Sequence, residues 1–129
     1  MVSSDGLFIY EYWNSIVKIN ADTSLPVQGI YLDQSSVFNN LAITKDNKYL
    51  IYSTGIVTQT DLMNDNNQTT IGIIKTSDMT EATTPFVLSF NDAILNFRHC
   101  MIDKILIFDD NQDNTQNTSY EFMMVGSTV

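Results

Sequence analysis

The apolar residues of this chain recur in short runs separated by polar turns. Three runs share one pattern, in which turn residues precede a brief apolar segment: Leu7–Tyr10 (LFIY), Tyr49–Tyr52 (YLIY) and Ile105–Phe108 (ILIF). Short runs rich in β-branched and aromatic residues, bounded by Asp, Asn and Gly, are typical of β-strands. The pattern therefore predicts a strand in each segment, and no segment has the 3.6-residue period of a helix.

A second apolar segment follows each of these runs: Ser15–Asn20 (SIVKIN), Thr70–Thr76 (TIGIIKT) and Tyr120–Gly126 (YEFMMVG). In the first two copies an Asp-containing turn and a proline, Pro26 or Pro85, then lead into a further strand. Proline suits the first position of an edge strand, because its missing N–H breaks no ladder bond there. Opening strands are predicted at Asn40–Lys45 (NLAITK) and Ala93–His99 (AILNFRH).

The predicted unit is a four-stranded antiparallel meander within a single all-β segment, residues 1–129, with approximate repeats at 1–34, 35–90 and 91–129. Tyr10, Tyr52 and Phe108 are predicted to be equivalent positions, at a spacing typical of propeller blades. The first copy lacks its opening strand and the third lacks its last strand. The chain is therefore expected to contain one complete blade and two partial ones.

The succession of an Asp-Asn turn, the strand KYLIYSTG, the strand IGIIKTSDM and the strand FVLSF resembles the β-propeller repeats of the LVIVD and YVTN types found in surface proteins. The resemblance covers most of the chain and implies a segment of a larger propeller, since closed propellers have about 4 to 8 blades. It also implies an extracellular or cell-surface location, with the cytoplasm as the alternative. A β-sandwich or another all-β form is the competing fold.

The formal net charge of −9 reflects only six Lys and Arg, which form no run in the sequence. Binding to nucleic acid requires clustered cations, so nucleic acid is not expected as a partner. No apolar run is long enough to insert into a membrane. The single cysteine, Cys100, excludes an internal disulfide and leaves the redox compartment open.

Two long polar segments, Gly55–Thr69 and Asp109–Ser119, are predicted to be loops that project side by side. Asp109, Asn111 and Asp113 have an Asp-x-Asn-x-Asp spacing that can surround calcium with oxygen ligands, although Asn114 and Tyr120 replace the Gly and Glu of an EF-hand. A solvated loop is the alternative, and no other cofactor is predicted.

The same two segments contain both N-x-Ser/Thr sequons of the chain, at Asn67 and Asn117. They predict N-linked glycans if the protein enters a secretory pathway.

Most aromatic residues fall within apolar strand patterns and are predicted to pack between sheets. Tyr12 and Trp13 are the exceptions, because strand alternation through YEYW leaves one set of aromatics exposed as a candidate binding surface. His99 and Cys100 are adjacent and would point to opposite faces of a strand, so they cannot form a catalytic dyad. No catalytic residue is predicted.

These observations predict a non-catalytic scaffold or recognition module of a larger surface protein, whose partners are other protein chains or the remainder of its own chain. Two alternatives stay open. The chain is a subunit of a filament or shell completed by strand addition from neighbours, or part of a propeller enzyme of the lactonase or sugar-oxidising kind.

Overall fold

The computed structural model describes residues 1–31, 36–56, 68–89, 100–111 and 119–128. The described residues form ten strands: β1 (Phe8–Tyr12), β2 (Ser15–Asn20), β3 (Pro26–Tyr31), β4 (Ser36–Ile43), β5 (Tyr49–Ile56), β6 (Gln68–Lys75), β7 (Thr80–Glu81), β8 (Phe86–Ser89), β9 (Cys100–Asn111) and β10 (Ser119–Thr128). Among them there is no helix of the length and apolarity that a membrane span requires.

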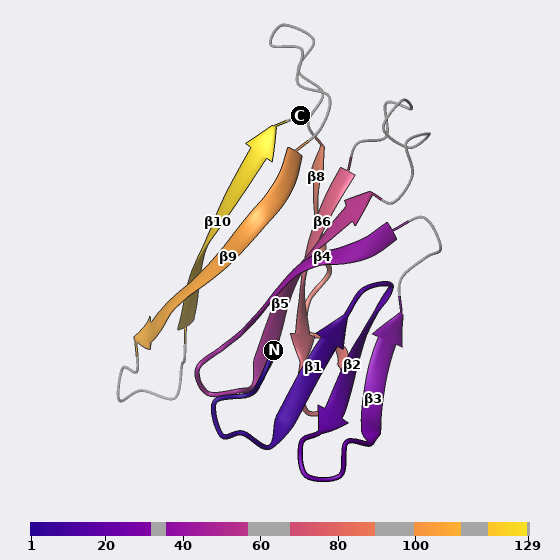
Figure 1. Cartoon of the computed structure of the whole chain (residues 1–129). Helices are drawn as coiled ribbons and strands as arrows, with labels where there is room; N and C mark the ends of the chain where they lie inside the picture. Colours follow the sequence, from indigo (N-terminus) through magenta and orange to yellow (C-terminus); the bar gives the residue numbers. More distant parts are fainter. Residues whose placement is uncertain (32–35, 57–67, 90–99, 112–118, 129) are drawn as a thin grey trace, which may run out of the picture.

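The strands form three antiparallel sheets (Figure 1). β1, β2 and β3 make an N-terminal sheet, β4 to β8 make a central sheet, and β9 and β10 make a C-terminal hairpin. The all-β prediction is confirmed, and so is the four-stranded meander of the second repeat, in the order β4-β5-β6-β7.

The outer strand of the central sheet is interrupted. β7 pairs with the end of β6 and β8 pairs with its beginning, so both lie along the same edge of β6. Pro26 begins the edge strand β3 as predicted, whereas Pro85 directly precedes β8 in the interruption. Proline at these two places removes no ladder donor from the interior of a sheet.

Two boundaries in the third repeat differ from the prediction. β9 runs without a turn through Asp103 and Lys104, and the pairing with β10 skips Asp103, which is a β-bulge. β9 also continues through Asp109 to Asn111, so the connection to β10 is shorter than expected. The register with β10 skips Asp103, Asp109 and Asp110, and pairing of the residues on either side of them continues the strand. The predicted strand Ala93–His99 lies outside the described residues.

The three sheets are stacked as layers, with the central sheet between the other two. Side chains on one face of the central sheet, including Leu50, Tyr52 and Ile74, join a core with Tyr10 and Ile16 of the N-terminal sheet. This core also contains Phe38, Leu41 and Met79.

Alternate residues point to the other face of the central sheet, as expected for a period of two. Ile51 and Ile71 form a second buried cluster there with Ile105 of β9. Partly buried side chains pack around this cluster: Ala42, Ile73, Ile107 and Met124. The central sheet is therefore covered on both faces.

The same turn precedes β1 and β5. Ser3 Oγ donates to Asp5 Oδ1 (2.5 Å) and accepts from the Phe8 N–H (3.0 Å). In the second copy, Thr44 Oγ1 donates to Asp46 Oδ1 (2.7 Å) and accepts from the Tyr49 N–H (3.1 Å). The position after each Asp has a positive φ, with Gly6 at 73° and Asn47 at 60°. Glycine and asparagine tolerate this left-handed conformation better than other residues.

The turns after β2 and β6 correspond as well. The Ser24 N–H donates to the Asn20 carbonyl, and the Met79 N–H donates to the Lys75 carbonyl, both at 2.9 Å. Ser24 and Met79 both have positive φ. The first two repeats therefore match residue for residue in the two turns that bound their first hairpin.

This correspondence corrects the predicted equivalence of Tyr10 with Tyr52. When the two turns are matched, Tyr10 is equivalent to Ile51 and Glu11 is equivalent to Tyr52. The alignment of LFIY with YLIY is therefore shifted by one residue from the structural one. Tyr10 and Ile51 each point toward the following sheet, whereas Tyr52 points back toward the preceding one. A shift of one residue moves a side chain to the other face, so the sequence similarity alone assigned the wrong face.

Candidate functional site

Exposed aromatic side chains gather at one end of the N-terminal sheet. Tyr12 ends β1 and is 39% exposed, Trp13 follows in the turn and is 67% exposed, and Tyr31 ends β3 and is 76% exposed. Ser15 pairs with Tyr31, and the Trp13 N–H donates to the Ser15 carbonyl. The three aromatic residues therefore lie at the same end of the sheet. We call Tyr12, Trp13 and Tyr31 the aromatic corner.

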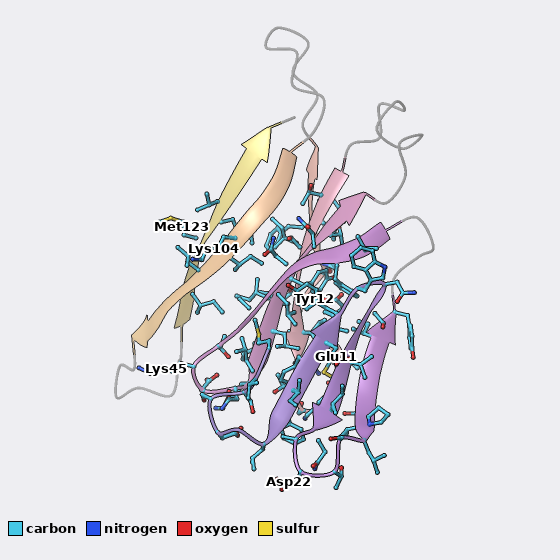
Figure 2. All side chains as sticks on the ribbon, viewed as in Figure 1. Glu11, Tyr12, Asp22, Lys45, Lys104 and Met123 are labelled. Carbon is cyan, nitrogen blue, oxygen red and sulfur yellow. The ribbon has the colours of Figure 1, made fainter. Side chains whose placement is uncertain are left out.

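The backbone of the aromatic corner is anchored to the central sheet. The Trp13 carbonyl accepts a hydrogen bond from the Phe38 N–H at 2.6 Å, and Phe38 is buried in the core. The indole ring itself stays exposed. Figure 2 shows Tyr12 and Glu11 next to each other along β1. Exposed Tyr and Trp side chains provide a large contact area at low entropic cost, which suits binding to a protein or a sugar.

The exposure of Tyr12 and Trp13 agrees with their predicted placement on the surface. Tyr31 and Phe86, which is 60% exposed, were expected to pack between sheets and instead lie on the surface. β3 and β8 are edge strands, and a sequence pattern of alternating apolar residues does not reveal whether a sheet is covered on its second face.

A buried polar pair lies between the N-terminal and central sheets. The Tyr52 hydroxyl donates to Glu81 Oε1 at 2.5 Å, and Glu81 Oε2 is buried with no hydrogen-bond partner in the described structure. The Tyr52 ring packs edge-on against Phe38, with centroids 4.9 Å apart, and lies over Gly72. A Cβ atom at Gly72 would come within 2.3 Å of this ring, so only glycine fits there.

Burial raises the pKa of both members of this pair. The pKa of Glu81 lies above its ordinary value because burial penalises the carboxylate, and the hydrogen bond from Tyr52 opposes that shift. The pKa of Tyr52 is raised by burial and further by Glu81. A tyrosine with a raised pKa keeps its proton at neutral pH and is a poor base. The hydrogen bond joins β5 to β7.

Lys18 connects the same two sheets. Its Nζ donates to the Thr76 carbonyl at 2.8 Å and lies 4.1 Å from the centre of the Phe8 ring. Only 9% of Lys18 is exposed. The ammonium thus satisfies a turn carbonyl and stacks on an aromatic face, a combination that stabilises a buried cation.

The predicted calcium ligands are only partly within the described residues. Asp109 and Asn111 lie at the end of β9 instead of in a loop, and Asp113 lies outside the described residues. In the part of the chain that the structure describes, no group of three or more His, Cys, Asp or Glu residues is placed to hold a metal ion. The calcium site stays a prediction.

The predicted glycan acceptors, Asn67 and Asn117, also lie outside the described residues. The third residues of the two sequons, Thr69 and Ser119, are in β6 and β10, and Thr69 is buried. The sequons were expected to fall wholly within loops, and the structure shows that each reaches into a strand. His99 lies outside the described residues, and Cys100 is the first residue of β9.

Comparison with protein-family models, with curated proteins and with solved structures found no match. What the structure shows is an all-β chain of antiparallel sheets, one of them containing a four-stranded meander. The described strands form a stack of three sheets and do not close into a ring.

Proposed function

We propose that this chain is a non-catalytic scaffold or recognition module built from β-propeller-type repeats, and a segment of a larger surface or extracellular protein. The observation that carries the proposal is the direction of stacking. Tyr10, Ile16 and Lys18 of the first repeat correspond to Ile51, Ile71 and Ile73 of the second, and both sets face the next sheet along the chain. Blades of a propeller follow one another in the same sense.

The recognition element of this module is the aromatic corner. Its three side chains are exposed and their backbone is tied to the core through the Trp13 carbonyl. The Tyr52–Glu81 pair lies between two sheets and joins β5 to β7. Fold alone does not determine function, so the proposal depends on this surface and on the stacking, with a protein or a glycan as the ligand class.

The test is to follow the protein in its native cells with an antibody raised against this chain. We expect surface labelling, an apparent mass above the 14.6 kDa of the chain, and a decrease in mass on glycosidase treatment. Replacing Asn67 and Asn117 by Gln should remove that decrease. Asn40→Gln, which lies outside any sequon, is the control. An unglycosylated species of the mass of this chain, found only inside the cell, would contradict the proposal.

A further inference from the structure

The N-terminal sheet has one apolar face that belongs to neither core. Tyr10, Ile16 and Lys18 point inward, so the alternate residues Ile9, Glu11, Val17 and Ile19 point outward. We call these four residues the leading face. None of them is part of either core cluster of the described residues. Ile9, Val17 and Ile19 are half-buried, and Glu11 is exposed.

The leading face has a covered counterpart in the central sheet. Ile9 pairs with Ile19 as Leu50 pairs with Ile74, and matching the turns makes these two pairs equivalent. Leu50 and Ile74 are completely buried because the N-terminal sheet lies on them. The equivalent pair in the first repeat, Ile9 and Ile19, belongs to neither core cluster of the described residues.

The C-terminal hairpin has an uncovered face of the complementary kind. Ile105, Ile107 and Met124 pack on the central sheet. The alternate residues on the hairpin, which point away from it, are Lys104, Leu106, Met123 and Val125. We call these four residues the trailing face. Met123 and Val125 are 49% and 47% exposed, and Figure 2 shows Lys104 and Met123 together on the hairpin.

We propose that the trailing face of one copy of this chain covers the leading face of a second copy, head to tail. This arrangement repeats a contact that is already present twice in the molecule. The N-terminal sheet packs on one face of the central sheet, and the C-terminal hairpin packs on the other face. The charges also match, because the leading face contains Glu11 and the trailing face contains Lys104. The inference names a partner for the proposed scaffold and rests on that role.

A symmetric dimer of two leading faces fits the observations less well. It would bring Glu11 toward the same residue of the other copy, and like charges across an interface oppose association. It would also leave both trailing faces uncovered. Head-to-tail contacts are heterologous and form a ring or an open filament, depending on the angle between successive copies.

Complementation of two blocked variants tests the direction of the contact. Val17→Lys blocks the leading face and Met123→Lys blocks the trailing face. We expect the unmodified chain to self-associate in sedimentation velocity as its concentration rises, and each variant alone to be monomeric. A mixture should form a one-to-one dimer through the two intact faces. Leu25→Lys is the control, since Leu25 is equally apolar and 64% exposed in a turn outside both faces, and should associate like the unmodified chain.

A charge exchange tests the pairing of Glu11 with Lys104. Glu11→Lys and Lys104→Glu should each weaken association by roughly tenfold or more, and the double variant should recover most of it. Circular dichroism of every variant separates loss of association from loss of fold. An unmodified chain that stays monomeric overturns the inference, as does a dimer that Met123→Lys leaves intact. Neither result affects the surface and glycan test of the scaffold role.

Discussion

The central sheet and the N-terminal sheet have the same first hairpin but different surroundings. The turns Ser3–Phe8 and Thr44–Tyr49 make the same hydrogen bonds, and β1 pairs with β2 in the register that β5 and β6 use. Ile74 is completely buried in the central sheet, whereas its counterpart Ile19 is only half-buried. The same backbone register thus presents an isoleucine to a covered face in one repeat and to an uncovered face in the other.

The next pair of positions along these strands differs in sequence between the two repeats. Tyr52 lies over Gly72 on the covered face, whereas the uncovered face has Glu11 opposite Val17. A large aromatic ring with its hydroxyl bound to Glu81 suits a buried interface between sheets. A charged Glu beside a β-branched residue suits a surface that is open in the free chain. Burial, more than backbone conformation, separates the two repeats.

The largest effect is expected from removing the equivalent isoleucines. Ile74→Ala empties a completely buried position and should lower the free energy of unfolding by about 2 to 5 kcal/mol. Ile19→Ala, the same substitution at the equivalent half-buried position, should lower it by about 1 kcal/mol. Urea denaturation of the two variants at low protein concentration measures the difference. Equal losses would show that the two faces are covered alike.

A smaller effect is expected where the two sheets differ in sequence. Gly72→Ala places a Cβ against the Tyr52 ring and should cost about 2 kcal/mol, because overpacking forces the ring to move. Gly29→Ala is the control, since its nearest contact would be the Ile16 carbonyl at 3.2 Å. Combining Gly72→Ala with Tyr52→Ala should cost less than the sum of the single changes. Strict additivity would contradict the packing of the ring over the glycine.

Periodicity and turn residues were sufficient to predict most of the described strands, but not β7. LFIY, YLIY and SIVKIN all lie in strands, and Pro26 begins an edge strand. These features are local, because each depends on alternation and turn chemistry within a few residues. The aromatic corner was partly predictable for the same reason, since alternation through YEYW places Trp13 on the face of the charged Glu11.

Features that depend on contacts distant in sequence could not be predicted in this way. The similarity of LFIY and YLIY aligned Tyr10 with Tyr52, although only the turn hydrogen bonds reveal the correct face. The pairing of Tyr52 with Glu81 depends on β7 meeting β6, which no local pattern indicates. The exposure of Tyr31 depends on whether another sheet covers it.

The Tyr52–Glu81 contact is absent from the N-terminal sheet, and Tyr52→Phe tests what it contributes. The substitution removes the donor to Glu81 Oε1, while the buried Oε2 already has no partner in the described structure, and this should cost about 1 to 2 kcal/mol at neutral pH. The cost should shrink in acid, where the carboxyl is protonated. Chemical denaturation at two pH values measures both effects. A cost that does not depend on pH would show that the charge of Glu81 does not contribute to it.

Glu81→Gln tests the pH dependence directly. The pKa of Glu81 in the folded chain lies above its ordinary value of 4.5. Its contribution to stability is therefore fully present below pH 4.5 and decreases as the pH rises through the folded-state pKa. Asp5 and Asp78 have lowered pKa values and contribute in the opposite direction, so their effect is lost as the pH falls. The stability of Glu81→Gln relative to the unmodified chain should consequently increase from acid to neutral pH.

The smallest effect is expected in the turn that both repeats share. Ser3→Ala and Thr44→Ala each remove a hydroxyl that donates to an aspartate and accepts from the first strand residue, and each should cost about 1 kcal/mol. Because the bonds are the same in both turns, the two losses should agree far more closely than those of Ile19→Ala and Ile74→Ala. Ser24→Ala, at a turn hydroxyl with no comparable role in β1 or β5, is the control. A much larger loss at Thr44 than at Ser3 would mean that the covering of the central sheet strengthens even its turns, and that the two repeats differ in more than their faces.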